Sequence, residues 1–425
     1  MGGACILKKT VRRIAGAAAL FLILFSHSGY CRSIDALPQT IILPKDTAVE
    51  FALPRFVALQ NRTDDALPVS VDEGEALTAR LAAETTGSAQ TSFSLFGITL
   101  KPVRVSVVED RCVGQGGQIV GIALLTDGAL VVGTSRVLAD DGTWRDPAGE
   151  AGLAAGDLLT HIDGEKIEDA SFVSQRLANL NGERVTLRLV RGEKTLEIAV
   201  QPVREAGSGT FRLGVWVRDS TAGVGTLTYA DAERGTYGAL GHGIVDNDTK
   251  QYLTVQDGRI AAARVTQITR GQSGAPGQIM GSYTLDEAAL GNICRNNEFG
   301  IYGALWSDPT QNTIPIGYRS QVETGPAQIL SAADGELRAY DCVIEKITPQ
   351  RSAQAKSLVV RVTDARLLEL TGGIVQGMSG SPIVQNGRLV ATVTHVFVND
   401  PQRGYGVFIE WMLEQSDALG LKNEG

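Results

Sequence analysis

Short apolar runs bounded by glycine recur along most of this chain, and they constrain its fold more than any other feature. The sequence contains 49 glycines and only 6% aromatic residues. Glycine allows the backbone angles of tight turns, and apolar runs of about four to eight residues between turns are typical of strands. We therefore expect a mainly β protein with some α-helix. The clearest strand-like runs cover residues 225–229, 358–363, 389–398 and 405–409.

Length and charge narrow the possibilities further. At 425 residues the chain is too long for one compact core, so two or three domains are expected. Its formal net charge of −8 argues against nucleic acid as a partner. The sequence has no Cys-x-x-Cys motif and no paired histidine ligands, so we expect neither a metal nor a cofactor.

The N-terminus has the pattern of an export signal. Four basic residues between positions 8 and 13 precede an apolar run over residues 14–25, and polar residues follow. The run is shorter than the roughly 20 residues of a relaxed membrane-spanning helix, which favours a cleaved signal over an anchor. Residues 1–32 are therefore interpreted as a signal peptide or membrane anchor, and either one exports the rest of the chain.

Three cysteines, Cys112, Cys294 and Cys342, lie in the exported part. An odd number allows at most one internal disulfide, and Cys294 with Cys342 is the candidate pair. One thiol is then left over.

Residues 33–110 combine proline-interrupted segments with a polar stretch, residues 72–92, that has few large apolar residues. We interpret this region as a linker with one or two strands, such as residues 102–108. Such a linker would hold the later domains away from a membrane and would be open to proteolysis.

Residues 111–204 follow the plan of a small separate domain. The segment AGLAAGDLL at residues 151–159 predicts the end of a short helix, a glycine turn and a strand. A predicted helix around residues 171–180 precedes two strands with alternating apolar residues. This order resembles the PDZ domains of bacterial proteases.

The resemblance to PDZ domains implies a peptide-binding function. Such domains bind a peptide as an added strand on an open sheet edge. By that resemblance Val120, Gly121 and Ile122 are the candidates for the peptide-facing edge. The alternative is that these three residues begin a buried strand.

The candidate nucleophile lies in residues 205–425, whose short strands and glycine turns suit two barrels or a sandwich. The segment GMSGSPIV at residues 377–384 resembles the nucleophile loop of trypsin-like peptidases. Amide hydrolysis by serine needs a hydroxyl activated by a base, and N–H donors for the oxyanion. Ser379 is therefore the candidate nucleophile, and the N–H groups of Gly377 and Ser379 are the candidate oxyanion hole.

A second segment, GQSGAP at residues 271–276, also fits the pattern Gly-x-Ser-Gly-x-Pro. Its serine, Ser273, lies only 31 residues after the best candidate for the base, His242, and no clear hairpin follows it. We therefore favour Ser379.

Histidine is the expected general base. His242 follows a strand and is flanked by glycines that would expose its imidazole, whereas His395 interrupts an apolar strand after the nucleophile loop. His395 is a candidate for the substrate pocket, with plain packing as the alternative. Asp364 is the candidate acid that orients the base, although an ion pair with Arg366 is its alternative role, and Asp246 is left as a second choice.

These stretches together resemble the stage IV sporulation protein B peptidase family over nearly the whole chain. Three long segments carry most of the resemblance: YGALGHGI at residues 237–244, GGIVQGMSGSP at residues 372–382 and THVFVNDP at residues 394–401. The resemblance implies a PDZ domain followed by a trypsin-like double-barrel serine peptidase. It also implies a triad of His242, Asp364 and Ser379 in that chain order.

The same resemblance implies a role in endospore formation. The peptidase would be exported across the forespore membrane into the intermembrane space, cleave itself, and then cut a membrane regulatory protein of a sigma-factor-processing complex. That cut would release an intramembrane protease that activates sigma-K. The implied partners are this membrane protein, the chain itself, peptide termini bound by the PDZ domain, and the membrane through the N-terminal segment.

Two other functions remain open. One is an exported PDZ scaffold whose peptidase-like domain is inactive. The other is a periplasmic quality-control protease, although such enzymes usually place their PDZ domains after the catalytic domain.

Overall fold

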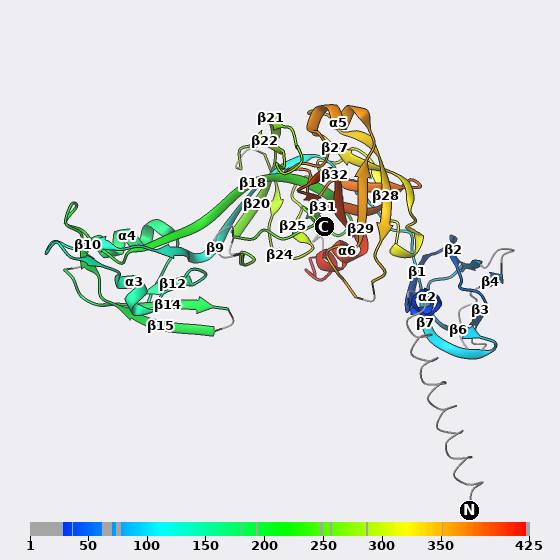
Figure 1. Cartoon of the computed structure of the whole chain (residues 1–425), viewed down its shortest axis with the longest axis horizontal. Coiled ribbons are helices and arrows are strands. Elements are labelled where there is room, and N and C mark those ends of the chain that lie inside the picture. The colour runs from blue at the N-terminus through cyan, green and yellow to red at the C-terminus, as the bar shows by residue number, and fades with distance from the viewer. Residues whose placement is uncertain are drawn as a thin grey trace, which may run out of the picture. The chain divides into compact units, whose positions relative to one another are not determined.

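The computed structural model (Figure 1) describes residues 29–421 apart from residues 36, 62–69, 74–77, 180, 193, 247–249, 256, 286–287 and 351. The apolar run interpreted as an export signal lies outside the described residues. Within the described part, no helix is both long and apolar enough to cross a membrane. The chain divides into two compact units, which are described separately.

The first unit is a folded β domain, built mainly from the residues before Cys112. After α2 (Gly29–Asp35), one sheet has the strand order β1-β7-β6-β3 and a second has the order β2-β5-β4. The strands are β1 (Thr40–Pro44), β2 (Ala48–Ala52), β3 (Val57–Asn61), β4 (Ser70–Glu73), β5 (Thr78–Ala82), β6 (Gly87–Leu95) and β7 (Ile98–Val108). A short 3-10 helix, η1 (Arg319–Gln321), returns to this unit.

The prediction that residues 33–110 form a linker is wrong. The strands enclose their own hydrophobic core, in which Ile41, Leu81 and Phe93 are fully buried. Each strand contributes few apolar residues, and these alternate with polar ones, as Val103 and Val105 do on β7. The core therefore becomes evident only when the strands are paired.

The predicted PDZ domain belongs to the second unit and is inserted into the first of the two β-barrels of that unit. Two long strands, β9 (Ile119–Thr134) and β18 (Val215–Asp231), pair antiparallel along most of their lengths and can be followed in Figure 1. Ala129 and Val131 on β9 pack into the PDZ core, whereas Val120 and Ile122 on the same strand pack into the barrel core. The predicted boundaries at residues 111 and 204 therefore do not separate the two cores.

Local signals explain the PDZ elements well. Asp146 caps α3 (Pro147–Ala151) through the Gly149 N–H, and Gly152 ends this helix with a φ of +87°. Asp169 caps α4 (Ala170–Ala178) in the same way. The remaining PDZ strands are β10 (Val137–Leu138), β11 (Trp144–Arg145), β12 (Leu158–Ile162), β13 (Glu165–Lys166), β14 (Val185–Arg191), β15 (Lys194–Val200), β16 (Val203–Arg204) and β17 (Phe211–Arg212).

The first barrel is a ring of six strands in the order β9-β18-β19-β25-β23-β20, with β20 returning to β9. An isolated bridge between Gly291 and Leu305 joins β23 to the end of β25. Its further strands are β19 (Thr236–Ala239), β20 (Asp257–Ala262), β23 (Ala289–Asn292) and β25 (Gly300–Ala304). β8 (Cys112–Gln115), β24 (Arg295–Asn297), β26 (Thr313–Pro315) and a hairpin of β21 (Arg264–Thr269) and β22 (Gln278–Ser282) flank it.

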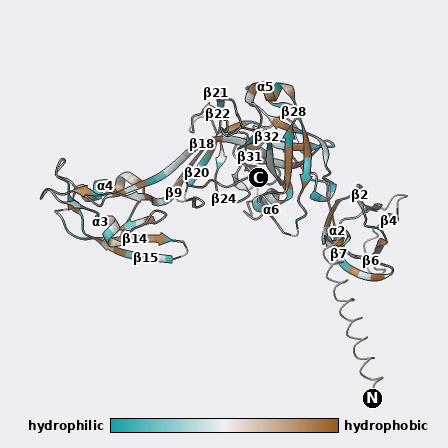
Figure 2. Cartoon of the chain, in the orientation of Figure 1, coloured by the Kyte–Doolittle hydropathy of each residue, from teal (hydrophilic) through white to brown (hydrophobic). Residues whose placement is uncertain are grey.

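The second barrel is closed, in the order β27-β28-β29-β32-β31-β30. Its strands are β27 (Gly325–Ser331), β28 (Arg338–Ile347), β29 (Leu358–Val362), β30 (Pro382–Gln385), β31 (Arg388–Phe397) and β32 (Asp400–Phe408), with the helices α5 (Ala365–Thr371) and α6 (Ile409–Asp417). Hydrophobic and hydrophilic residues share the same strands in Figure 2, as expected for strands with one face in a core. The expected mainly β fold, with a small domain at the predicted PDZ position and a double β-barrel, is confirmed.

The predicted peptide-facing edge is wrong. Val120 pairs with Gly225 on β18 and with Ala262 on β20, and Gly121 and Ile122 are paired on both sides in the same way. Because both edges of the strand are hydrogen-bonded, no peptide strand can be added there. These residues form a buried strand of the barrel.

The predicted disulfide is also absent. Cys112, Cys294 and Cys342 are all free thiols, with Cys342 buried on β28 and Cys294 exposed. Burial raises the pKa of the Cys342 thiol to about 12, so it remains protonated at neutral pH.

Candidate active site

The structure brings His242 and Ser379 to the same short segment of β31. The Ser379 hydroxyl donates a hydrogen bond to the Thr394 carbonyl at 2.8 Å. The ring of the next residue, His395, lies with its centroid 4.7 Å from that of His242. His242 follows β19 of the first barrel and Ser379 precedes β30 of the second, so each barrel supplies one of the two side chains.

Glycines allow this close approach. Gly241, before His242, has a φ of +68° and packs against Thr392 and Thr394 of β31. Gly380, after Ser379, has a φ of +97°, and a Cβ there would collide with the backbone of Thr226 and Leu240. The nucleophile loop therefore rests directly on the backbone of the first barrel, and only glycine fits at residue 380.

Thr226 on β18 fixes the candidate oxyanion hole. Its hydroxyl donates to the Gly377 carbonyl at 2.7 Å, and its backbone N–H donates to the Ser379 carbonyl at 3.0 Å. Neither the Gly377 N–H nor the Ser379 N–H donates a hydrogen bond to another described residue. Both donors are thus available for an oxyanion. In the sequence, Thr226 lies in the strand-like run at residues 225–229, and nothing in that run indicates a role beside the nucleophile.

The hairpin of β21 and β22 supports the same loop from its other side. The Gln376 N–H donates to the Gly277 carbonyl at 2.9 Å, and the Ile279 N–H donates to the Gln376 carbonyl at 2.8 Å. Ile279 is buried and packs against Gly377. The peptide before the candidate oxyanion hole is therefore held in register by this hairpin.

The competing serine belongs to the supporting hairpin. The Ser273 hydroxyl donates to the Asn399 carbonyl at 2.9 Å, beyond the end of β31, whereas the Ser379 hydroxyl donates to Thr394, the residue next to His395. The geometry thus agrees with the preference for Ser379, because a nucleophile needs a base within reach.

Both histidines near Ser379 favour the neutral form. Burial lowers the pKa of His242, although the hydrogen bond from its Nδ1 to the Gly243 carbonyl, at 2.9 Å, partly opposes the shift. His395 reaches solvent, yet the atoms packed around its ring, followed by the nearby His242 and Lys356, lower its pKa to about 4. A carbonyl only accepts, so Nδ1 of His242 carries the proton and Nε2 has the free lone pair that a general base needs.

Asp364 does not hydrogen-bond His242, which corrects the predicted triad. Its carboxylate caps α5 through the N–H groups of Arg366 and Leu367, and it pairs with the Arg366 guanidinium at 2.8 Å. The hydrogen bonds from Arg366 hold the pKa of Asp364 well below its usual range. The alternative role, an ion pair with Arg366, is the one observed, because the start of α5 supplies donors that satisfy this carboxylate locally.

Asp246, the second choice, does not reach the base either. It is buried and pairs with Arg218 of β18 at 3.1 Å. Within the described residues, the Gly243 carbonyl is the polar partner of the His242 ring.

An open strand edge lies beside α4 in the PDZ domain. Residues 215–217 of β18 pair with β9 on one side, and within the described residues no strand pairs with the other side. Val217 is partly buried against the PDZ core, whereas its neighbour Trp216 is 64% exposed. This edge, rather than Val120 to Ile122, has the unpaired backbone that an added peptide strand requires.

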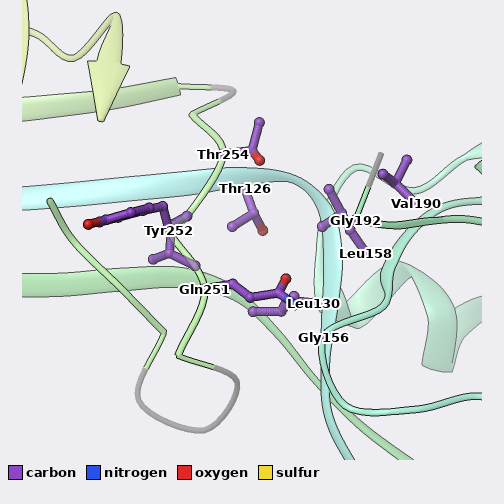
Figure 3. Close-up of a pocket in the computed structure, with 10 residues that line it drawn as sticks. Thr126, Leu130, Gly156, Leu158, Val190, Gly192, Gln251, Tyr252 and Thr254 are labelled. Atoms are coloured by element: carbon purple, nitrogen blue, oxygen red, sulfur yellow. The ribbon is translucent and has the colours of Figure 1, made fainter. Parts of the chain in front are cut away.

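Two cavities lie apart from this chemistry. The smaller, of about 70 Å³, is found where residues 251–254 meet the PDZ domain, with Thr126, Leu158 and Tyr252 in its lining (Figure 3). The larger, of about 810 Å³, is lined by residues such as Arg264, Leu290 and Leu337. Neither cavity is lined by His242 or Ser379. The described residues contain no group of three or more side chains that could hold a metal ion.

Part of this chain is similar to a curated protein. A probable periplasmic serine endoprotease, DegP-like, from Bartonella henselae is 31% identical over 120 residues, which is 27% of this chain and 24% of that protein. This chain therefore spans about a quarter of the length of that curated relative.

Two solved structures are also similar. The PDZ domain of the SdrC-like protein from Listeria monocytogenes is 25% identical over 21% of this chain and 87% of that chain, with a TM-score of 0.18. A thermostable serine protease from an extremophilic microorganism is 15% identical over 46% of this chain and 91% of that chain, with a TM-score of 0.27.

Two family patterns match the chain directly. Residues 146–191 match a PDZ domain, and residues 209–413 match the SpoIVB peptidase S55 family. The second match includes His242, Ser379 and both loops that meet at Thr394, while the barrel strands β8 and β9 precede it. Residues 209–413, which contain His242 and Ser379, therefore match the SpoIVB peptidase S55 family of serine peptidases, and a PDZ domain match precedes them.

Proposed function

We propose that this chain is an exported serine endopeptidase with Ser379 as its nucleophile and His242 as its general base. The observation that carries the proposal is the meeting of the two side chains at Thr394 and His395. The Ser379 hydroxyl donates to the carbonyl of the first residue, and the His242 ring contacts the ring of the second.

The proposed reaction follows from the atoms at this site. Nε2 of His242 takes the proton of the Ser379 hydroxyl while the oxygen attacks the carbonyl carbon of the scissile peptide bond. The oxyanion then accepts hydrogen bonds from the Gly377 and Ser379 N–H groups. The imidazolium gives its proton to the leaving amine, the C–N bond breaks, and a water attacks the acyl-enzyme by the reverse sequence of proton transfers.

One local movement precedes the attack. The Ser379 hydroxyl points to the Thr394 carbonyl, so it must turn toward His242 before its proton can be taken. Catalytic hydrogen bonds often form fully only when the substrate is bound, and a change of the Ser379 side-chain rotamer would release its hydroxyl from Thr394.

We propose that a backbone carbonyl, instead of a carboxylate, orients the base. The Gly243 carbonyl fixes the tautomer of His242, and the tilted ring of His395 packs beside it. His395 also lies on β31 next to the nucleophile, in a position to contact the substrate. A carbonyl dipole stabilises the imidazolium less than a full negative charge does, so we expect a slower enzyme than one with a complete triad.

The family match supports a finer role in sporulation signalling. In this role the peptidase acts outside the cytoplasm, cleaves itself, and cuts a membrane regulatory protein whose loss allows an intramembrane protease to activate sigma-K. The DegP-like relative, itself named periplasmic, agrees with an extracytoplasmic site of action. The same relative favours a second candidate, a quality-control protease, which would cleave unfolded proteins at many sites.

The first test replaces each candidate nucleophile. Ser379→Ala and His242→Ala should each lower the hydrolysis of an unfolded protein substrate at least about 10³-fold, because the oxygen or its base is lost. Ser273→Ala, the matched control in the same sequence pattern, should retain activity within about twofold. Electrophoresis and mass spectrometry of the products measure both rate and cleavage sites. Cleavage at only a few sites would favour the signalling role. Cleavage by Ser379→Ala at the wild-type rate would show that Ser379 is not the nucleophile.

The second test concerns Thr226. Thr226→Val removes the hydroxyl that holds the Gly377 carbonyl but keeps the backbone N–H. We expect kcat to fall about tenfold with little change in KM, because the oxyanion loop matters most in the transition state. Thr226→Ser should restore most of the activity. An equal loss in both variants would show that the hydroxyl does not position the loop.

The third test separates a helix cap from a triad member. Asp364→Asn keeps a side-chain oxygen that caps α5, so the unfolding temperature should change little and kcat should stay within about threefold. Loss of a carboxylate that orients the base costs about 10⁴-fold in kcat. A decrease of that size, in a variant that unfolds at the normal temperature, would restore Asp364 to the triad.

The fourth test places peptide binding on the open edge of β18. Val217→Ser should weaken binding of a labelled peptide that ends in valine with a free carboxylate by about tenfold, because Val217 lies on the side that packs against the PDZ core. The matched control is Trp216→Ser, on the opposite face of the strand, which should leave the affinity within about twofold. Fluorescence anisotropy measures both. Equal affinities in the two variants and the wild type would exclude this edge.

A further inference from the structure

Four large apolar side chains are exposed around two turns of the β domain in the first unit. Phe56 is 64% exposed, Phe96 77%, Ile98 71% and Leu100 38%. The rings of Phe56 and Phe96 contact each other, with centroids 5.3 Å apart. We call these four residues the apolar tip. Exposed apolar residues are common singly, but a contiguous group of this kind marks an interaction surface.

The backbone of the apolar tip is unusual for phenylalanine. Phe96 has a φ of +50° and Gly97 a φ of +81°, and together they form the two-residue turn between β6 and β7. Such turns favour Asn-Gly or Asp-Gly, because most side chains avoid left-handed angles. Phe56 also has a left-handed φ, of +63°. Two phenylalanines thus occupy strained positions where they gain little burial, which points to a contact outside the folded chain.

The apolar tip lies close to the point where the N-terminal segment joins the domain. The Tyr30 hydroxyl, in α2, donates a hydrogen bond to the carbonyl of Arg55, the residue before Phe56. The apolar run at residues 14–25 ends five residues before Tyr30. Five residues span at most about 18 Å. Whenever that run is in a bilayer, the Phe56 turn is therefore held near the membrane surface.

The charges around the apolar tip suit an anionic surface. The β6–β7 hairpin contains Lys101 and Arg104 and no acidic residue, although the whole chain carries a net charge of −8. Arg55 and Arg104 are exposed. Basic residues flanking exposed aromatic and aliphatic side chains are typical of segments that enter the head-group region of a membrane.

We infer that the apolar tip is a membrane-insertion site for a bilayer with anionic lipids. Phe56, Phe96 and Ile98 enter the boundary between head groups and acyl chains, and the exposed Arg55 next to Phe56 remains among the phosphates. The β domain then rests on the membrane surface whether or not the N-terminal run is retained. This contact differs from anchoring by that run, because it uses residues of the folded domain (β6 and β7 in Figure 1).

The test uses the full-length chain with a tryptophan in the apolar tip. Phe96→Trp is mixed with vesicles of phosphatidylglycerol and phosphatidylcholine whose acyl chains are either brominated or unmodified, and bound protein is isolated by flotation. Bromine quenches tryptophans that reach the acyl chains. After subtraction of the wild-type signal, we expect a blue shift and at least about twofold quenching by the brominated lipid. Ile98→Trp, as an independent variant, should behave similarly.

The matched control is Ser88→Trp, an exposed position near the other end of the same hairpin. It should show neither the blue shift nor the quenching. Unfolding temperatures close to that of the wild type verify that each variant is folded. The proposal is overturned if the chain does not float, or if the tryptophans at positions 96 and 98 are unquenched in the floated protein. A blue shift that needs no vesicles and grows with protein concentration also overturns it, since the tip then pairs with another copy.

Discussion

The hydrogen bonds from Thr226 to the nucleophile loop connect the two halves of the catalytic domain. Thr226 lies on β18, which pairs with β9 in both the PDZ sheet and the first barrel. One continuous strand of 17 residues therefore forms the open PDZ edge near its start and holds the loop of Gly377 and Ser379 near its end. Because Gly380 rests on the Thr226 backbone without space for a Cβ, the position of the loop depends on this strand.

In the proposed site, the base and its hydrogen-bond partner are both neutral groups. The rings of His242 and His395 are in contact, and burial disfavours a charge on either ring. The acidic residues proposed as orienting groups are satisfied elsewhere, Asp364 by the start of α5 and Arg366, and Asp246 by Arg218. A neutral imidazole with a fixed tautomer is ready to accept a proton, and the charge that then forms is stabilised by a carbonyl dipole.

The two Gly-x-Ser-Gly-x-Pro segments show why a motif requires its tertiary context. Ser273 and Ser379 occur in nearly the same local sequence. Of the two, only Ser379 bonds to Thr394 of β31, and the ring of the next residue, His395, contacts His242. The loop of Ser273 instead joins the hairpin that holds Gln376 by backbone hydrogen bonds. Ser379 therefore lies at the site, whereas Ser273 lies in the hairpin that supports the nucleophile loop.

Features that depend only on neighbouring residues can be predicted from the sequence alone. The helix at residues 147–151 has its cap and its terminating glycine within a few residues, and the loop at residues 377–382 carries the glycines that its bends require. The pairing partners of the strands depend on the tertiary structure. Val120 to Ile122 are paired on both sides, with strands about 100 and 140 residues further along the chain. The strands before Cys112 have few apolar residues each and enclose a core only when they pair. The physical reason is that a side chain's conformational preference is set by its neighbours in sequence, whereas hydrogen-bond partners and burial are set by whichever distant segment packs against it.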